Sequence, residues 1–142
     1  MALPDSANYP DVRAAIAIDL DSTVLPDSVI ALSPYAPAAE AEIARRVANY
    51  ADVIAGGGDN AALLTRAAIL ICAALLVPAV PSLLSERSAD GQSYTRQPID
   101  AAALVERLWS QANQAIDQVL GESPVTAARP TVFALACGRR GR

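Results

Sequence analysis

Residues 60–78, NAALLTRAAILICAALLVP, restrict the choice of fold more than any other stretch of this chain. The stretch has helical spacing, and apolar residues occupy nearly every side of that helix, which is typical of a central helix covered from several directions. Its uncharged part, residues 67–80, is shorter than the roughly 20 residues that a bilayer span needs, and Pro78 interrupts it. We therefore expect a buried core helix of a soluble protein that has no membrane contact.

Length and composition favour one all-α domain. At 142 residues the chain suits one domain, or one domain with a tail, and 53% of its residues are apolar. Many of these are alanines and only 4% of the residues are aromatic, which favours closely packed helices over a sheet sandwich. We expect a small helical bundle over residues 1–121, followed by an extended C-terminal segment, 122–142.

Proline and glycine positions divide the first half of the chain into helices. Pro10 suits the first turn of a short helix that breaks around Asp19–Ser22, and Pro26 can begin another short helix. One longer helix is expected from Ala38 to Gly56–Gly58, where it ends because glycine adopts left-handed conformations at low cost. The predicted apolar face of this helix consists of Ala41, Ala44, Val47, Ala48, Ala51 and Ile54.

The last helix has the clearest amphipathic pattern in the chain. Asp100 is placed to cap its N-terminus and Gly121 to end it, as Asp59 is placed to cap the central helix. One stripe is apolar and is expected to face the core: Ala101, Leu104, Leu108, Ala112, Ala115 or Ile116, and Val119. The opposite side is polar and is expected to face outward: Glu106, Arg107, Gln111, Asn113, Gln114, Asp117 and Gln118.

The charge is unevenly distributed along the chain. The net charge of −4 argues against nucleic-acid binding by the chain as a whole, because nucleic-acid-binding proteins present a basic face. From Gly121 onward, however, one acid (Glu122) stands against four arginines (129, 139, 140 and 142). The chain therefore combines a negative body with a basic C-terminal segment.

Residues that catalyse reactions or bind metals are scarce. The chain has no histidine, which excludes a Ser-His-Asp triad or a Cys-His pair. Cys72 and Cys137 lack metal-ligand spacing; Cys72 is expected to act as a small hydrophobe, and a disulfide between the two is left open. For Asp19 and Asp21, helix capping and loop solvation are favoured over a metal pair or the nucleophile of an aspartate phosphatase. We predict no enzymatic activity, no metal and no cofactor.

The sequence shows neither a signal peptide at its start nor a phosphate-binding loop in its glycine-rich stretch. The first residues have neither the basic start nor the apolar stretch of a signal peptide. With only two cysteines in the chain, a reducing cytoplasm is the expected compartment. The stretch AGGGDN lacks the lysine and the spacing of a phosphate-binding loop. It is better explained as a helix break.

A polar stretch, SERSADGQSYTRQ at residues 85–97, separates the last two expected helices. Asp90-Gly91 is a strong hairpin signal, and the flanking residues are mostly polar. An isolated two-stranded ribbon is only marginally stable in water. The stretch is therefore either a loop without a fixed partner or a hairpin-like arm that another chain stabilises.

The C-terminal segment contains TVFALAC at residues 131–137, which mixes strand-forming residues with alanine. A helical body offers it no partner strand, so it is either disordered or pairs its backbone with another molecule. The closing GRRGR can contact phosphate or an acidic surface of a partner protein. The expected docking residues are Thr131, Val132, Phe133, Leu135, Arg139, Arg140 and Arg142.

The order of these elements resembles that of the head-to-tail adaptor (connector) proteins of tailed bacteriophages. The resemblance covers residues 8–121: a short helix, EAEIARRVANYAD, an alanine-rich central helix, LLSERSADGQSYTRQ and a long last helix. In that family a segment with a serine-glutamate start, a glycine turn and a Ser-x-aromatic continuation precedes the final helix. The matching residues here are Ser85, Glu86, Gly91, Ser93 and Tyr94.

The resemblance implies a ring, commonly a dodecamer, beneath the capsid portal in the neck of a virion assembled in the host cytoplasm. The arm would reach toward neighbouring subunits or the next tail component, such as a stopper protein, and the C-terminal segment would embrace the portal. DNA would pass without specific binding, so we expect a neutral or acidic lining. The expected arm contacts are Ser85, Glu86, Arg87, Asp90, Gly91, Ser93, Tyr94 and Arg96.

Two other classes of function stay open at this point. A small helical regulatory or ligand-binding module, for example a dimer, could use the basic C-terminal segment as a nucleic-acid-binding arm. A small enzyme is disfavoured because the sequence shows no acid–base pair. A ring of high copy number would distinguish the adaptor from a compact dimer.

Overall fold

The computed structural model describes residues 2–17, 20–80 and 100–121. Within these ranges every regular element is a helix, so the predicted all-α class is confirmed. The elements in chain order are η1 (Ser6–Asn8), α1 (Tyr9–Ile16), α2 (Asp27–Ile30), α3 (Ala36–Arg46), α4 (Tyr50–Gly56), α5 (Gly58–Leu76), η2 (Val77–Ala79) and α7 (Ala101–Leu120).

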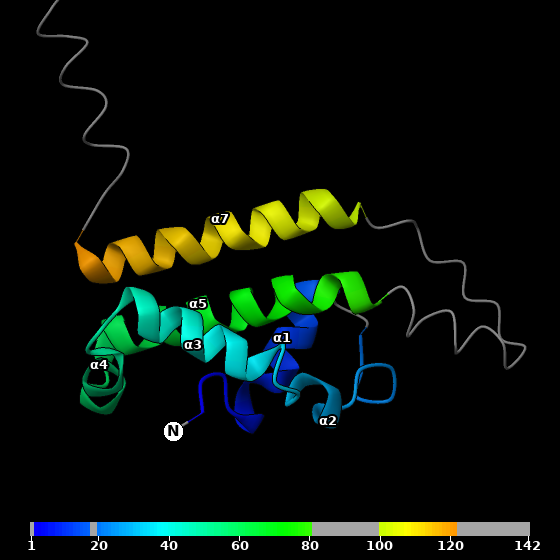
Figure 1. Ribbon diagram of the computed structural model, residues 1–142, viewed down its shortest axis with the longest axis horizontal. Helices are drawn as coiled ribbons and strands as arrows, with labels where there is room; N and C mark the ends of the chain where they lie inside the picture. The colour runs from blue at the N-terminus through cyan, green and yellow to red at the C-terminus, as the bar shows by residue number, and fades with distance from the viewer. Residues whose placement is uncertain (1, 18–19, 81–99, 122–142) are drawn as a thin grey trace, which may run out of the picture.

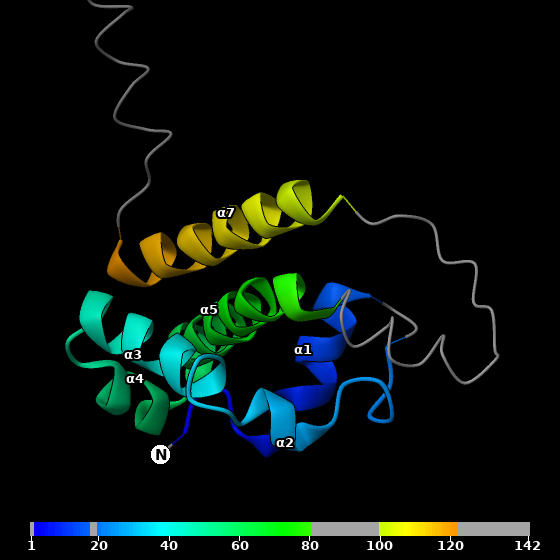
Figure 2. The same ribbon diagram turned by 45° about the vertical axis from the view of Figure 1, so that its right-hand side comes forward.

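Helix α5 lies at the centre of the bundle. Helices α1, α3 and α4 pack against it on one side, and α7 packs along the other (Figures 1 and 2). Leu64, Ile71, Cys72 and Leu76 of α5 have no exposed surface. Burying one leucine or isoleucine side chain in this way contributes about 1.5–3 kcal/mol. The prediction of a central helix covered on several sides is therefore confirmed.

The stretch formed by α5 and η2 is long and apolar enough to cross a membrane. Within the described ranges, one helical stretch (Gly58–Ala79, hydropathy 2.2) meets that criterion of length and composition. A single such helix is weak evidence for a span, because the core helix of a soluble protein meets the same criterion. Here 56% of the apolar window is buried inside the bundle, as a core helix requires.

Helix α7 has the bounds and the buried face that its sequence predicts. The Asp100 carboxylate accepts a hydrogen bond from the Ala103 backbone N–H at 3.2 Å, which caps the N-terminus. Gly121 ends the helix with a φ of 73°, in the left-handed region that glycine adopts without strain. The buried stripe comprises Leu104, Leu108, Ala112, Ala115 and Ile116, with Ala101 and Val119 partly buried beside it.

The single helix predicted from Ala38 to the glycines is wrong. Helix α3 ends at Arg46, Val47 is extended (φ −123°, ψ 93°), and α4 begins at Tyr50. Across the break, the Tyr50 hydroxyl donates a hydrogen bond to the Glu40 carboxylate of α3 at 3.1 Å. Side chains of α4 then pack partly against α5, so tertiary contacts outweigh the helical propensity of the connecting residues.

The predicted apolar face of that helix is also largely wrong. The buried face consists of Ala36, Ala39, Ile43 and Val47, so of the predicted face only Val47 is buried. The large Ile43 side chain gains more from burial than an alanine methyl group, and it therefore decides which side of α3 faces the core. Of the other predicted positions, Ala44 and Ile54 are half-buried and Ala41, Ala48 and Ala51 are exposed.

The three glycines end one helix and begin the next. Helix α4 ends at Gly56, and Gly57 and Gly58 have φ angles of 67° and 81°, which confirms the predicted break. The predicted cap by Asp59 is wrong, because Gly57 occupies the N-cap position and no side chain bonds there. Asp59 instead lies in the first turn of α5, where a negative charge is favourable to the helix dipole.

The N-terminal helices cover α5 on the side away from α7. Pro10 lies in the first turn of α1 and Pro26 directly precedes α2, as predicted. Val12 of α1, Ile30 of α2 and Leu25 between them have no exposed surface, and Ile16 at the end of α1 is buried as well. These side chains join one hydrophobic core with α5.

Two predicted segments lie outside the described residues. They are the hairpin-like arm at 85–97 and the C-terminal segment at 122–142. The first falls between η2 and α7, and the second follows α7. All of the predicted arm and docking residues belong to these two segments.

Candidate functional site

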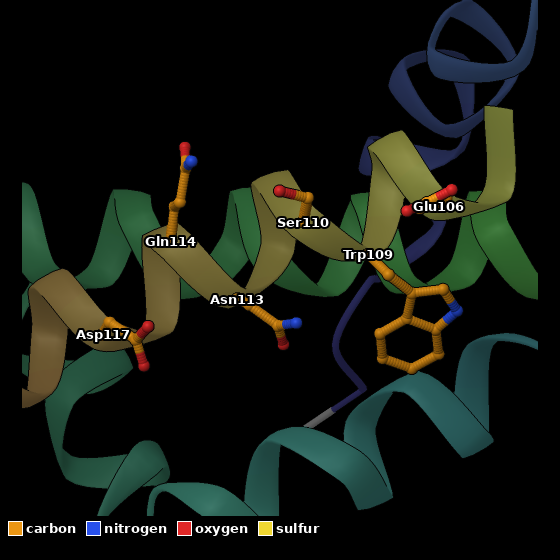
Figure 3. A pocket seen from close by; sticks show the side chains of 6 residues that line it. All are labelled: Glu106, Trp109, Ser110, Asn113, Gln114 and Asp117. Atoms are coloured by element: carbon orange, nitrogen blue, oxygen red, sulfur yellow. The ribbon is translucent and has the colours of Figure 1, made fainter. Parts of the chain in front are cut away.

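A hollow of about 580 Å³ lies along the outer side of α7. All six residues that line it belong to this helix: Glu106, Trp109, Ser110, Asn113, Gln114 and Asp117. Trp109, Asn113 and Asp117 point toward α3, whereas Ser110 and Gln114 point away from it (Figure 3). We call this feature the α7 groove. It places one large aromatic ring among amide and carboxylate groups.

Arg46, the last residue of α3, connects the groove to the rest of the bundle. Its guanidinium donates a hydrogen bond to the Asn113 amide oxygen at 2.5 Å and lies 3.9 Å from the Asp117 carboxylate. Asn113 and Asp117 are therefore half-buried, although the sequence predicted that both face outward. That prediction was wrong for these two residues because helical periodicity does not show which neighbouring helix supplies a partner.

Trp109 and Glu106 provide the groups of the groove that remain available to a ligand. The Trp109 side chain packs partly against the core and also lines the groove. Glu106 is exposed, and within the described residues it makes no ion pair. An indole face beside a carboxylate favours a cation, since both groups attract positive charge.

The groove geometry suits binding better than catalysis. Glu106 and Asp117 lie eleven positions apart on one straight helix, which separates them by roughly 16 Å along its axis. This exceeds the separation at which two carboxylates can act on one bond. No group of three or more metal-ligating side chains occurs within the described ranges.

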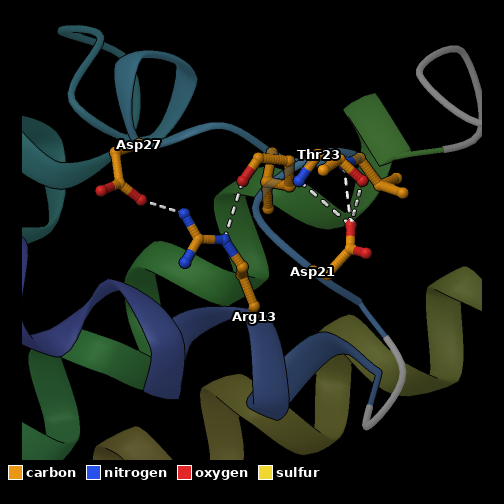
Figure 4. Close-up of polar contacts among 6 residues, drawn as sticks. Arg13, Asp21, Thr23 and Asp27 are labelled. Carbon is orange, nitrogen blue, oxygen red and sulfur yellow. Dashed lines mark hydrogen bonds and ion pairs between the residues drawn. The ribbon is translucent and has the colours of Figure 1, made fainter.

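A second polar cluster surrounds Arg13 of α1, which is only 6% exposed. Its Nε donates a hydrogen bond to the Leu25 carbonyl oxygen at 2.8 Å, and its Nη2 pairs with the Asp27 carboxylate (Figure 4). No local sequence pattern marks this cluster, because the partners of Arg13 lie 12 and 14 residues away along the chain. Arg13 fastens α1 to the segment that precedes α2, which is a structural role.

Asp21 stabilises the turn beside this cluster. Its carboxylate accepts hydrogen bonds from the Thr23 backbone N–H at 3.0 Å, the Thr23 hydroxyl at 2.6 Å and the Val24 N–H at 3.1 Å (Figure 4). These bonds hold a turn between α1 and α2, so Asp21 stabilises a loop and does not cap a helix. Asp19, its companion in the sequence, lies outside the described residues.

Cys72 lies in the interior of α5 as a free thiol. Burial raises its pKa to about 12, because the charged thiolate would lose its hydration in the apolar core. A neutral buried thiol is neither a good nucleophile nor a metal ligand, so Cys72 behaves as the small hydrophobe that its context predicted. Cys137, the other half of the disulfide left open above, lies outside the described residues.

Comparisons with known proteins identify no relative of this chain. No family model, no curated protein and no solved structure matches it.

Proposed function

We propose that this protein is a non-enzymatic structural component of a bacteriophage neck, where copies of it form a ring between the capsid portal and the tail. The proposal rests on the resemblance in element order and in the stretch Ser85–Tyr94 described above. The all-α class of the body agrees with that resemblance.

The arrangement of α5 and α7 is the observation that carries the proposal furthest. The two helices run antiparallel, so the end of η2 and the start of α7 lie together at one end of the bundle (Figure 1). The end of α7 lies at the opposite end (Figure 1). The proposed arm, residues 85–97, would thus extend from one end of the body and the C-terminal segment from the other. A link between two neighbours in a stack requires contacts at both ends.

The outer face of α7 gives such a subunit a lateral surface. Helix α7 packs mainly against α5 and η2, and its exposed residues include Arg107, Gln111, Gln114 and Gln118. This face is polar and carries charges of both signs, so it can remain in water before assembly and contact a neighbour afterwards. In a ring, copies would meet through this face.

The charge of the chain suits a ring through which DNA passes. DNA binding depends on basic groups that neutralise phosphates, and the net charge of −4 opposes it. In the proposed ring, the lining is neutral or acidic, and the arginines of the C-terminal segment contact protein instead of DNA. Retention of duplex DNA by the purified protein at moderate salt would count against this lining.

Mixing the full chain with its cognate portal tests the proposal. Adaptors of this kind can remain monomeric until a portal is present, so the portal must be included. We expect negative-stain images and a native mass that show a ring of many copies bound to the portal. A stable dimer or monomer that does not bind the portal would refute the proposal.

Removal of residues 124–142 separates docking from folding. The described body ends at Gly121, whose left-handed conformation closes α7, and the deletion should leave the circular dichroism of the helices intact. Portal binding should be lost because the docking residues are removed. Unchanged assembly after this deletion would refute the docking role of the segment.

A ligand-binding or regulatory module is the second candidate, and the α7 groove is the observation that favours it. Its volume of about 580 Å³ lies within the usual range for small-molecule sites. The groove is, however, formed by one helix and is open to solvent, so it would enclose little of a small ligand. A compact dimer that forms without any portal, together with saturable binding of a small ligand, would favour this candidate over the ring.

A further inference from the structure

We propose that the α7 groove binds the arginine-rich end of this chain's own C-terminal segment, residues 139–142, in the unassembled protein. This contact would cover Trp109 and Glu106 until a partner displaces it. The inference concerns the isolated chain and does not depend on the ring or on the portal.

Charge complementarity is the first argument for this occupant. The groove carries the carboxylates of Glu106 and Asp117, and Asp117 is only loosely paired with Arg46 at 3.9 Å. The C-terminal segment contains Arg139, Arg140 and Arg142 and a single acid, Glu122, at its start. Guanidinium groups pair with carboxylates and stack on indole rings, so one arginine can use both Glu106 and Trp109.

The path of the chain is the second argument. The segment begins directly after Gly121, about one helical turn beyond Asp117, at the end of the same helix that carries the groove. Arg139 lies eighteen positions after Gly121, and an extended chain of that length reaches roughly 60 Å. The groove extends only about 16 Å along α7, so the arginines can reach every part of it.

Tethering favours the chain's own segment over that of a second copy. Attachment to the same chain gives the arginines an effective concentration at the groove on the order of millimolar. At micromolar concentrations of protein, the same arginines on another molecule are far more dilute. A weak contact can therefore form within one chain without causing dimerisation.

The chain contains a probe at each side of the proposed contact. Trp109 is the single tryptophan, so its indole N–H gives one resolved NMR signal at the groove. Cys72 is fully buried and its pKa is raised to about 12, so a thiol-directed nitroxide label would react at Cys137. Cys137 lies two residues before Arg139, and the label would report when the basic end approaches Trp109.

The experiment compares broadening of the Trp109 signal in spin-labelled full-length variants. A triple variant combines Arg139→Gln, Arg140→Gln and Arg142→Gln, and it gives the broadening expected when the segment does not bind the groove. The single variant Glu106→Gln removes the exposed carboxylate of the groove. The matched controls are Arg129→Gln in the C-terminal segment and Asp52→Asn, an exposed acid on α4 outside the groove. Circular dichroism checks that every variant keeps its helices.

We expect strong broadening of the Trp109 signal in the natural sequence and in both controls. The broadening should be weak in the triple variant and intermediate in Glu106→Gln. Salt at 1 M should also reduce the broadening, because it shortens the screening length to about 3 Å. Equal broadening in the natural sequence and the triple variant would overturn the proposal.

Mixed samples distinguish contact within one chain from contact between two. In these samples, the isotope-labelled chain carries no nitroxide and the nitroxide-labelled chain carries no isotope. Broadening of Trp109 in this mixture, at the level seen in the doubly labelled chain, would overturn the proposal in favour of a second copy as occupant. Neither result bears on whether the portal is bound, so the proposed function is tested separately.

Discussion

Helices α5 and α7 have nearly the same length and lie side by side, yet they use their surfaces in opposite ways. Helix α5 spans Gly58–Leu76 and buries side chains on most of its circumference, whereas α7 spans Ala101–Leu120 and buries one stripe. The remaining face of α7 is polar and contains the groove. The comparison suggests that α5 determines the fold and that α7 supplies the surface available to other molecules.

The two helices also differ in how they are fixed at their ends. Helix α7 begins with a side-chain cap at Asp100, whereas α5 begins after Gly57 without any side-chain cap. An amphipathic helix covered on one side gains less from packing than a central helix, so local signals matter more for it. The predictions below test this difference from the largest expected effect to the smallest.

Truncation of a central side chain in α5 should have the largest effect. Ile71→Ala removes a fully buried side chain and leaves a cavity, so we expect a loss of about 2–5 kcal/mol in the free energy of unfolding. Gln111→Ala on the exposed face of α7 should change it by less than about 0.5 kcal/mol. Urea unfolding measures both. Similar losses for the two variants would contradict the division of roles.

Loss of the Arg13 contacts should have the next largest effect. Arg13→Met replaces the aliphatic part of the arginine but removes its guanidinium, so the Leu25 carbonyl oxygen loses its buried donor. We expect the free energy of unfolding to fall by about 1–3 kcal/mol. Arg45→Met is the matched control, because Arg45 pairs with Glu42 on the exposed side of α3 and should matter little. Thermal unfolding followed by circular dichroism should show a clear downward shift only for the Arg13 variant.

The two helix starts should respond differently to the loss of aspartate. Asp100→Ala removes the cap of α7 and should cost about 0.5–2 kcal/mol. Asp59→Ala removes only a favourable charge in the first turn of α5, and we expect a smaller effect. Equal costs in urea unfolding would show that the carboxylate of Asp59 does more than the structure indicates.

The alkaline pH dependence of stability should reveal the buried thiol of α5. The pKa of Cys72 is about 12 in the folded protein, above the value of about 8.5 for an exposed thiol, so the unfolded chain loses this proton first. The stabilising contribution is therefore complete below about pH 8.5 and declines as the pH rises toward 12. The midpoint of urea unfolding should fall less steeply above pH 9 in Cys72→Ala than in the natural sequence. Parallel curves would contradict the raised pKa.

Sequence reasoning located the features whose causes are local. Helix α7 was predicted with its cap, its buried stripe and its end, because Asp100, the apolar period and Gly121 all lie within one continuous stretch. The central position of α5 followed from its apolar circumference. The hairpin-like arm and the docking segment remain predictions, since they lie outside the described residues.

The features that the sequence did not reveal depend on contacts between distant residues. The break between α3 and α4 places Tyr50 against Glu40 and α4 against α5, and no glycine or proline marks it. Arg46 and Asn113, which join α3 to the groove, are 67 positions apart. Periodicity therefore predicted a polar face on α7 but not the contact between that face and α3.

Assembly on the portal by a variant with an altered α7 surface tests the central claim most directly. The test variant carries Gln111→Arg and Gln118→Arg, which place two positive charges on the exposed face of α7. The control variant carries Ala41→Arg and Ala51→Arg, which place two positive charges at exposed positions of α3 and α4. We expect all of these proteins to unfold at the same urea concentration as the natural sequence. Only the α7 variant should fail to form a ring on the portal, as measured by native mass. A normal ring from that variant, or its unfolding, would contradict the account.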